Sequence, residues 1–550
     1  MPTRRLKSTI IAIGALLLAS LATNVSAQGV TTGAIGGTVS QDTGAPLSGA
    51  QVLVVNTATG FRTGGTTRDN GQFLVSGLEV GGPYTVTVRR IGYEPHTRQN
   101  LYIQLSQTER IAVTLTPQVT QISSLEIRAT TGEIISATNM GTKTTVSAQA
   151  LERAPSIGRN LIDFTKAAPQ VVSSGSGYSA GGMSVRMNNV QIDGATERDV
   201  FGLGSTGQPG GQISAKAISI DAVKEYQILL APYDVRQGNF GGMLLNAVTK
   251  SGTNNLHGTV FQYYRNQDFG RNVPTLRATE FNRRMTGFTL GGPIISDRLH
   301  FFTANEWQRE STPVSGPFQG QPAGALTAFP FTDAEISRFA AAYKAKPGSP
   351  DPGSAGILNS PSPNDNLFGR LDFQINPDHR LVARFNYTDA TNEGRRQNAR
   401  TSARGVFTSN FHTINSNKKA PVVQLFSNFK NGWSNEVFAG ATIVRDRRVP
   451  PLGQFPQIVV NYSGGRTLFA GTDQFSQVNE LDADTYEITN NLTIPRGDHT
   501  FVVGTRNELV KIRNLFTESS FGVWTFADIA AFEAGTAGGF RRAFILDQGG

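Results

Sequence analysis

The chain has 550 residues, of which 38% are hydrophobic, 17% are charged and 60 are glycine, a mixture typical of short strands, turns and polar loops rather than of a cytosolic enzyme. It contains no cysteine, which excludes a disulfide framework, a thiolate metal site and a cysteine nucleophile. The net charge is +9, but lysine and arginine are scattered among acidic residues, so no nucleic-acid partner is expected.

The first 27 residues have the pattern of a secretory signal peptide. Basic residues at positions 4, 5 and 7 precede a nearly unbroken apolar run at 9–22, and the small residues Val25-Ser26-Ala27 follow. The run has about 14 residues, fewer than the ~20 that a membrane-spanning helix requires, which argues against an anchor. We expect export by the general secretory route, with cleavage between Ala27 and Gln28. No later stretch reaches about 18 consecutive apolar residues, so a membrane-embedded part would have to be a closed β-barrel.

Residues 31–117 are predicted to form short strands separated by glycine-rich turns. Asn70-Gly71 has the chemistry of a tight hairpin turn. In the segment Tyr84 to Val88 apolar residues alternate with threonine, as in a strand with one buried face. About seven such strands in ~85 residues predict a β-sandwich.

Three motifs in this region carry a family resemblance. They lie at 37–52, 67–73 and 82–93, and their order of glycines, prolines and aromatic residues resembles the carboxypeptidase regulatory-like domain. The resemblance implies a transthyretin-like β-sandwich over residues 28–117. It does not imply peptidase activity, because none of the six histidines is followed by glutamate three residues later, as an H-x-x-E zinc site requires.

The character of the sequence changes after residue 117. Residues 118–134 form a polar linker, and residues 135–254 are predicted to be an α+β unit with a helix at 158–168 that ends before Pro169. The segments 181–194, 223–229 and 240–252 are expected to contain its strands.

This unit resembles the plug domain of TonB-dependent receptors, in particular the Oar-like branch that carries an N-terminal regulatory-like sandwich. One matching plug motif comprises Arg186, Ile192, Asp193 and Gly194. The plug–barrel junction matches over 241–258 and includes Asn246, Thr249, Lys250, Ser251 and Gly252. The family keeps its TonB box where this chain has Leu125, Glu126, Ile127, Arg128 and Ala129. The alternative for this short segment is a plain interdomain linker.

Residues 255–550 show the alternation of an antiparallel transmembrane β-barrel. Leu381, Ala383, Phe385 and Tyr387 are expected on one face of a strand, and Arg384, Asn386 and Thr388 on the other. Polar residues facing the lumen are typical of a wide pore. We predict about nine strands between 258 and 515, a tenth near Arg541, and external loops at 309–364 and 389–419. Such receptors have about 22 strands, so the sequence is interpreted as the first part of a barrel, truncated at its C-terminus.

No catalytic constellation is evident, and neither enzymatic activity nor a cofactor or metal is expected. The glycine-rich runs at 174–182 and 202–211 lack the Gly-Lys-Ser/Thr of a phosphate-binding loop. The resemblance implies an outer-membrane receptor of a Gram-negative-type bacterium that takes up a large or scarce ligand into the periplasm. Its partners would be outer-membrane lipid, the ligand and a TonB-type energy-transducing protein of the inner membrane. The alternatives are an adhesin or structural surface protein of the same fold, and a soluble secreted β-rich enzyme.

Overall fold

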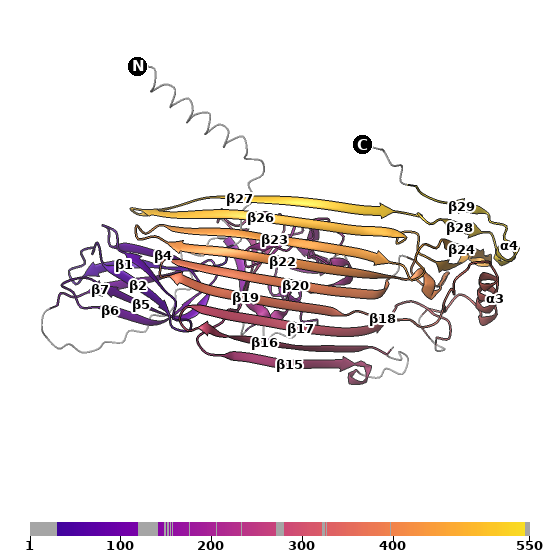
Figure 1. Ribbon diagram of the computed structural model, residues 1–550, viewed down its shortest axis with the longest axis horizontal. Coiled ribbons are helices and arrows are strands. Elements are labelled where there is room, and N and C mark those ends of the chain that lie inside the picture. Colours follow the sequence, from indigo (N-terminus) through magenta and orange to yellow (C-terminus); the bar gives the residue numbers. More distant parts are fainter. Residues whose placement is uncertain are drawn as a thin grey trace, which may run out of the picture.

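The protein has three main parts and a smaller unit at its far end (Figure 1). The computed structural model describes residues 30–118, 141–147, 150, 153, 156, 158–174, 177–204, 206–232, 234–270, 280–321, 325, 327–395 and 398–544. A small sandwich lies at one end of a sheet of long strands, which we call the wall sheet, and the plug lies against one face of that sheet. The expected cleavage site at Ala27 and Gln28 and the candidate TonB box, Leu125 to Ala129, lie outside the described residues.

The first part is a two-layer β-sandwich, as the sequence predicts. Its sheets have the strand orders β4-β1-β7 and β3-β2-β5-β6, and all neighbours are antiparallel except β1 and β7. Tyr84, Val86 and Val88 of β5 are buried between the layers, because alternate residues of a strand point to the same face. The strands are β1 (Gly33–Gln41), β2 (Gln51–Asn56), β3 (Arg62–Thr66), β4 (Gln72–Leu78), β5 (Gly81–Arg89), β6 (His96–Ile103) and β7 (Thr108–Leu115).

The plug is built on a five-stranded sheet in the order β12-β11-β14-β13-β8, with a separate hairpin of β9 and β10. Its apolar core includes Tyr226, Ile228 and Leu245 and is completed by Phe302 and Phe368 of the wall sheet. The elements are β8 (Gly141–Ser147), η1 (Leu161–Ala167), β9 (Val171–Ser174), β10 (Gly177–Ala180), η2 (Val185–Met187), β11 (Asn189–Ile192), β12 (Ala195–Thr196), η3 (Gly211–Ile213), η4 (Ile220–Ala222), β13 (Val223–Pro232) and β14 (Leu244–Thr249).

The helix expected at 158–168 is shorter and tighter than predicted. It is a 3-10 helix, η1, capped by Asn160. Arg159 has a φ of 50°, which no right-handed helix accommodates, so the helix cannot start earlier. Pro169 restricts the residue before it to an extended conformation, and Ala168 ends the helix with a ψ of 119°.

The wall sheet contains nine consecutive antiparallel strands in the order β15-β16-β17-β19-β20-β22-β23-β26-β27, with the short β18 (Asn359–Pro361) beside β17. β15 and β27 are its two edges, so within the described residues the barrel is not closed. The strands are β15 (His257–Asn266), β16 (Asn282–Ile295), β17 (Leu299–Pro313), β19 (Asn364–Asn376), β20 (His379–Arg395), β22 (His412–Asn428), β23 (Ser434–Val449), β26 (Val478–Arg496) and β27 (His499–Thr517), and η5 (Gln267–Phe269) follows β15.

The two faces of the wall sheet differ as the alternation predicts. On β20, Arg384, Asn386 and Thr388 are buried against the plug, whereas Phe385 is 46% exposed on the outer face. The polar face therefore points inward and the apolar face outward, which is the reverse of a soluble barrel. Among the described residues, no helix is long and apolar enough to cross a membrane.

The loop predictions were wrong in their bounds. The stretch 389–419 is largely strand, because β20 and β22 extend into it, and 309–364 contains a helix. The expected tenth strand near Arg541 is β29, which pairs with β28 outside the wall sheet. β29 belongs to a distal subdomain with an aromatic core that includes Phe339, Phe407 and Phe532. This subdomain comprises α3 (Asp333–Lys344), β21 (Arg404–Val406), η6 (Thr408–Asn410), β24 (Gln457–Tyr462), η7 (Ser463–Gly465), β25 (Arg466–Gly471), β28 (Val523–Phe526), α4 (Ile529–Ala534) and β29 (Gly539–Arg541).

The outward orientation of Phe385 predicts a penalty for charge at that position. In lipid vesicles, Phe385→Arg should lower the free energy of unfolding by about 2–4 kcal/mol, because the guanidinium would face hydrocarbon. Tyr102→Arg, at an exposed sandwich position, should change it by less than about 0.5 kcal/mol. Urea titrations in phospholipid vesicles measure both, and equal effects would contradict the assigned orientation.

Candidate functional site

Asp193, at the turn between β11 and β12, connects the plug to the wall sheet. Asp193 and Gly194 both have positive φ values, 44° and 81°, which makes the turn tight. The carboxylate accepts hydrogen bonds from the Thr249 backbone N–H at 2.8 Å and from the Thr249 hydroxyl at 2.7 Å. Arg384 Nε of β20 lies 3.1 Å from Asp193 Oδ2, and Arg370 Nη1 of β19 lies 4.0 Å from Oδ1. One plug carboxylate thus faces two cations of the wall.

Glu197 makes a second connection of the same kind, one strand further along. The ammonium group of Lys418, on β22, forms a buried ion pair with the Glu197 carboxylate and donates a hydrogen bond to the Ala217 carbonyl at 2.7 Å. Asn386 Nδ2 of β20 donates to Glu197 Oε1 at 3.2 Å and to the same carbonyl at 2.9 Å. Both plug acids therefore lie opposite basic residues of the inward face.

Other contacts in this interface carry charges of both signs. Lys216 of the plug lies 2.5 Å from Glu306 Oε1 of β17, and the Ser219 hydroxyl donates to Glu306 Oε2 at 3.0 Å. Arg506 of β27 donates to Thr196 Oγ1 at 2.5 Å. The plug is therefore held along β17, β20, β22 and β27 by charged and polar groups.

The charged contacts between the plug and the wall sheet respond differently to the loss of one partner and to the separation of both. Removing one partner of a buried ion pair costs about 3–5 kcal/mol, because the other charge stays buried without compensation. When both partners separate into water, however, each recovers its hydration, whereas an apolar interface would lose about 25 cal/mol for each Å² exposed. The charged part of the interface therefore resists the loss of a single partner, and it adds less to the cost of separating plug and wall than the apolar contacts with Phe302 and Phe368 do.

The predicted junction residues lie where the plug meets both other parts. Asn246 Nδ2 donates to the Val30 carbonyl at the start of the sandwich at 2.6 Å, and the Lys250 N–H donates to the Ala222 carbonyl at 2.7 Å. Gly252 passes so close to β17 that an added Cβ would lie 2.2 Å from the Phe301 carbonyl oxygen. No side chain fits between the two backbones at this position, so the residue must be glycine.

The predicted plug motif is only partly brought together. Ile192 is fully buried, and its carbonyl accepts a hydrogen bond from Arg384. Arg186 lies apart from this contact, exposed, and its Nε donates to the Gly202 carbonyl at 3.1 Å. Asp193 is thus the charged member of the motif that faces the wall.

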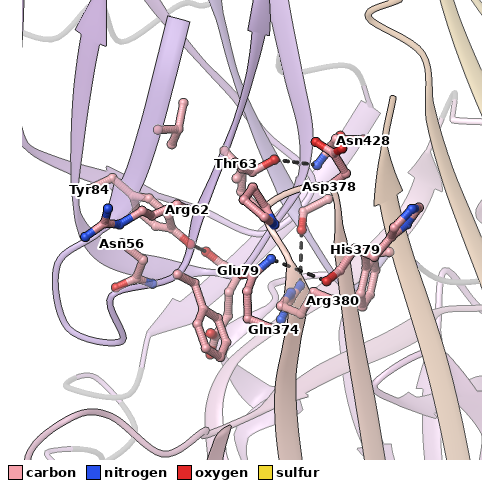
Figure 2. A pocket seen from close by; sticks show the side chains of 16 residues that line it. Asn56, Arg62, Thr63, Glu79, Tyr84, Gln374, Asp378, His379, Arg380 and Asn428 are labelled. Carbon is pink, nitrogen blue, oxygen red and sulfur yellow. Dashed lines mark hydrogen bonds between the residues drawn. The ribbon is translucent and has the colours of Figure 1, made fainter. Parts of the chain in front are cut away.

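Sequence reasoning did not find Glu79, a buried sandwich residue close to both other parts of the protein; Figure 2 shows it near Arg380 of the wall sheet. Its carboxylate accepts a hydrogen bond from the Ser251 hydroxyl at the predicted junction, and Lys224 Nζ of the plug lies 3.3 Å away. Arg380 of β20 donates to the Gly77 carbonyl of the sandwich at 3.1 Å. The Tyr84 hydroxyl donates to the Glu79 carbonyl at 2.8 Å. Sandwich, plug and wall therefore meet at one buried carboxylate.

The electrostatics of this junction favour the ionised form of Glu79. Burial opposes ionisation and is the largest single effect, but the positive charges of Lys224, Arg370 and Arg380 and the hydrogen bond from Ser251 outweigh it. Together they lower the pKa of Glu79 from 4.5 to about 2. The carboxylate is thus charged at every physiological pH and stays paired with its neighbours.

The described residues of the junction and of the plug interface do not form a metal-binding cluster. Within the described ranges, no group of three or more histidine, aspartate or glutamate residues could hold a metal ion. The cleft between the sandwich and the β19–β20 turn is small, about 40 Å³, enough for little more than water. The contacts described above therefore hold protein segments together.

Comparisons with known proteins agree with this architecture. An outer membrane beta barrel domain matches residues 248–545, and a carboxypeptidase regulatory-like domain matches residues 34–116. The TonB-dependent transporter Oar of Myxococcus xanthus is 25% identical over 335 residues, covering 57% of this chain and 29% of the relative, so the chain spans less than a third of that protein's length.

Two solved structures are also similar. The outer membrane transporter YddB from Escherichia coli matches with 11% identity and a TM-score of 0.49, over 70% of this chain and 50% of that one. The ferripyoverdine receptor of Pseudomonas aeruginosa matches with 16% identity and a TM-score of 0.44, over 69% of this chain and 44% of that one.

The buried position of Asp193 predicts a large effect of its neutralisation. Asp193→Asn should lower the free energy of plug unfolding by about 3 kcal/mol, because Arg384 remains buried beside a neutral group. Asp221→Asn is the matched control: its partner Arg159 is 2.6 Å away but both side chains are partly exposed, so the loss should be below about 1 kcal/mol. Native-state hydrogen exchange of β14 amides measures both, and similar losses would show that the buried pair is unimportant.

The lowered pKa of Glu79 predicts an acid-dependent contribution to stability. The pKa of Glu79 is lower in the folded state than in the unfolded state. Ionised Glu79 therefore makes its full contribution to the free energy of unfolding above pH 4.5, and this contribution disappears as pH falls through about 2. At pH 6 the free energy of unfolding of the wild type should exceed that of Glu79→Gln by about 3 kcal/mol. This difference should vanish near pH 2. Urea unfolding of both proteins across this range tests it, and a difference that does not change with pH would contradict it.

Proposed function

The chain belongs to the outer membrane beta barrel domain family, and from that premise we propose that it is a TonB-dependent receptor for active uptake of a large or scarce ligand into the periplasm. The ligand binds the outer face of the plug and the external loops. Movement of the plug then opens a path along the polar face of the wall sheet. The protein acts as a transporter and not as an enzyme.

The observation that carries this proposal is the plug held by buried charges against the inward face. Asp193 and Glu197 are matched by Arg384 and Lys418 on adjacent wall strands. A structural barrel without transport has no need for an internal body seated on groups that regain hydration when they separate. A receptor that opens repeatedly does need it.

The energy for plug movement must come from outside the outer membrane, which has no nucleotide supply. We assign this role to a TonB-type protein of the inner membrane that binds Leu125 to Ala129, between the sandwich and the plug in the sequence. Tension on this segment acts on the plug, which follows it in the chain. Outer-membrane lipid surrounds the exposed face that includes Phe385.

Partner binding can be tested by site-specific crosslinking, because the chain contains no cysteine. Ile127→Cys should form a disulfide with a cysteine-bearing TonB periplasmic domain in living cells. Ile91→Cys, which is fully exposed on the sandwich, is the control for random collision and should give only background. Equal crosslinking of both variants would argue against a TonB box at 125–129.

Transport is tested with the same segment deleted. Cells that carry the wild type should deplete at least one component of a defined mixture of ferric siderophores, cobalamin, oligosaccharides and peptides. Deletion of 125–129 should reduce this depletion to the level of cells without the gene. Surface adhesion that persists in the deletion variant, without any depletion by the wild type, would favour the adhesin instead.

A further inference from the structure

The sandwich covers the plug as well as preceding it. Leu105, in the turn before β7, lies on the plug strand β13, next to the central strand β14: its N–H donates to Glu225 Oε1 at 3.1 Å, and Gln227 Nε2 donates to its carbonyl at 2.6 Å. Leu105 also forms a small apolar cluster with Val80 of the sandwich and Val248 of β14. The sandwich thus contacts two neighbouring strands of the plug sheet.

The sandwich also rests on the wall-sheet hairpins at that end of the strands (Figure 1). Arg68 donates to the Gly497 carbonyl in the β26–β27 turn at 2.6 Å, and Asn70 Nδ2 donates to Asp498 Oδ1 at 2.8 Å. Further along the rim, Asn428 at the end of β22 donates to the Thr63 hydroxyl at 3.1 Å, a contact visible in Figure 2. A single small domain therefore spans several hairpins and the plug between them.

We propose that the sandwich is a removable lid on the periplasmic side of the plug, and that it must leave its seat on the wall before the plug opens. This inference rests on the transport function proposed above. It assigns to the sandwich a regulatory role: while it is docked, β13 and the junction at Ser251 are fixed, and a ligand path along the plug ends at the lid.

The contacts explain why the lid is removable. Those at the rim are hydrogen bonds from exposed side chains such as Arg68 and Asn70, which water replaces at little cost. The apolar contact with the plug is limited to the cluster around Leu105. The plug, in contrast, is seated on fully buried ion pairs such as Lys418 with Glu197. Among the described residues, Glu79 and Lys224 form the one strong ion pair between sandwich and plug, whereas the plug is held on the wall by several such pairs. Under a common load the lid therefore releases before the plug.

The contacts also explain why release is required. β13 lies between β14 and β8 in the plug sheet, so the plug cannot rearrange without moving it. Glu225 and Gln227 of β13 both form hydrogen bonds with the backbone of Leu105, and Ser251 forms one with Glu79. As long as the sandwich stays on the wall, these contacts hold the sheet and the junction in place.

A reversible lock between sandwich and wall tests the proposal. A Cβ added at Gly77 would lie 3.7 Å from Phe426 Cβ, within the range of a disulfide, so Gly77→Cys with Phe426→Cys forms the first lock. Gly77 has a φ of 71°, which is unfavourable for cysteine, so a second lock is made independently. It joins Thr63→Cys of β3 and Asn428→Cys of β22, whose native side chains are hydrogen-bonded at 3.1 Å. The matched control joins Thr87→Cys and Thr97→Cys, which face each other within the sandwich.

The readout is ion conductance of the full-length protein in planar lipid bilayers while urea is raised on the periplasmic side. The wild type should open as its plug is released. Each oxidised lock should reduce the open probability by about tenfold or more at the same urea concentration, and reduction of the disulfide should restore it. The control disulfide should have no effect.

The possible failures are distinguishable. If the oxidised locks open like their reduced forms, the plug moves under a docked sandwich and the lid is disproved, while transport stands. If the wild type does not conduct at any urea concentration below barrel unfolding, no path exists past the plug, and the transport function falls together with the lid.

Discussion

The structure depends on one constraint: the plug must be complementary in charge to the inner face of the wall sheet. Arg384 and Lys418 would be costly inside a folded protein if nothing faced them. Asp193 and Glu197 of the plug face them, so neither part satisfies its buried charges without the other. The alternation of the wall strands places apolar side chains such as Phe385 outside. The same alternation that exposes an apolar surface to lipid thus provides the polar seat of the plug.

The sandwich extends this arrangement to a third body. Glu79 is buried among positive charges of the plug and the wall, which outweigh the cost of its burial and lower its pKa. The contact at Leu105 fixes the plug strand β13 from the same side. The sandwich is therefore placed where its contacts can restrain the plug, as the lid proposal requires.

Much of this architecture could be predicted from the sequence, because it follows from local patterns. Alternation identified the two faces of β20, and the turn at Asn70-Gly71 and the strand Tyr84 to Val88 identified the sandwich. Pairings between distant residues carry no local signal. Arg384 was expected on the polar face, but nothing in the sequence selects Asp193 as its partner, and Glu79 resembles any surface glutamate. The shortened helix depends on the backbone of Arg159, and the distal subdomain assembles from strands that are distant in the sequence.

The most direct test of the account is hydrogen exchange of the protein in outer membranes with the TonB-type partner bound and energised, compared with the same membranes after the proton gradient is collapsed. The account predicts faster exchange of the plug strands β11, β13 and β14 in the energised state only, while the β20 and β22 amides of the wall remain protected in both. Unchanged protection of the plug strands in energised membranes would contradict it, because a plug that never leaves its charged seat cannot open a path.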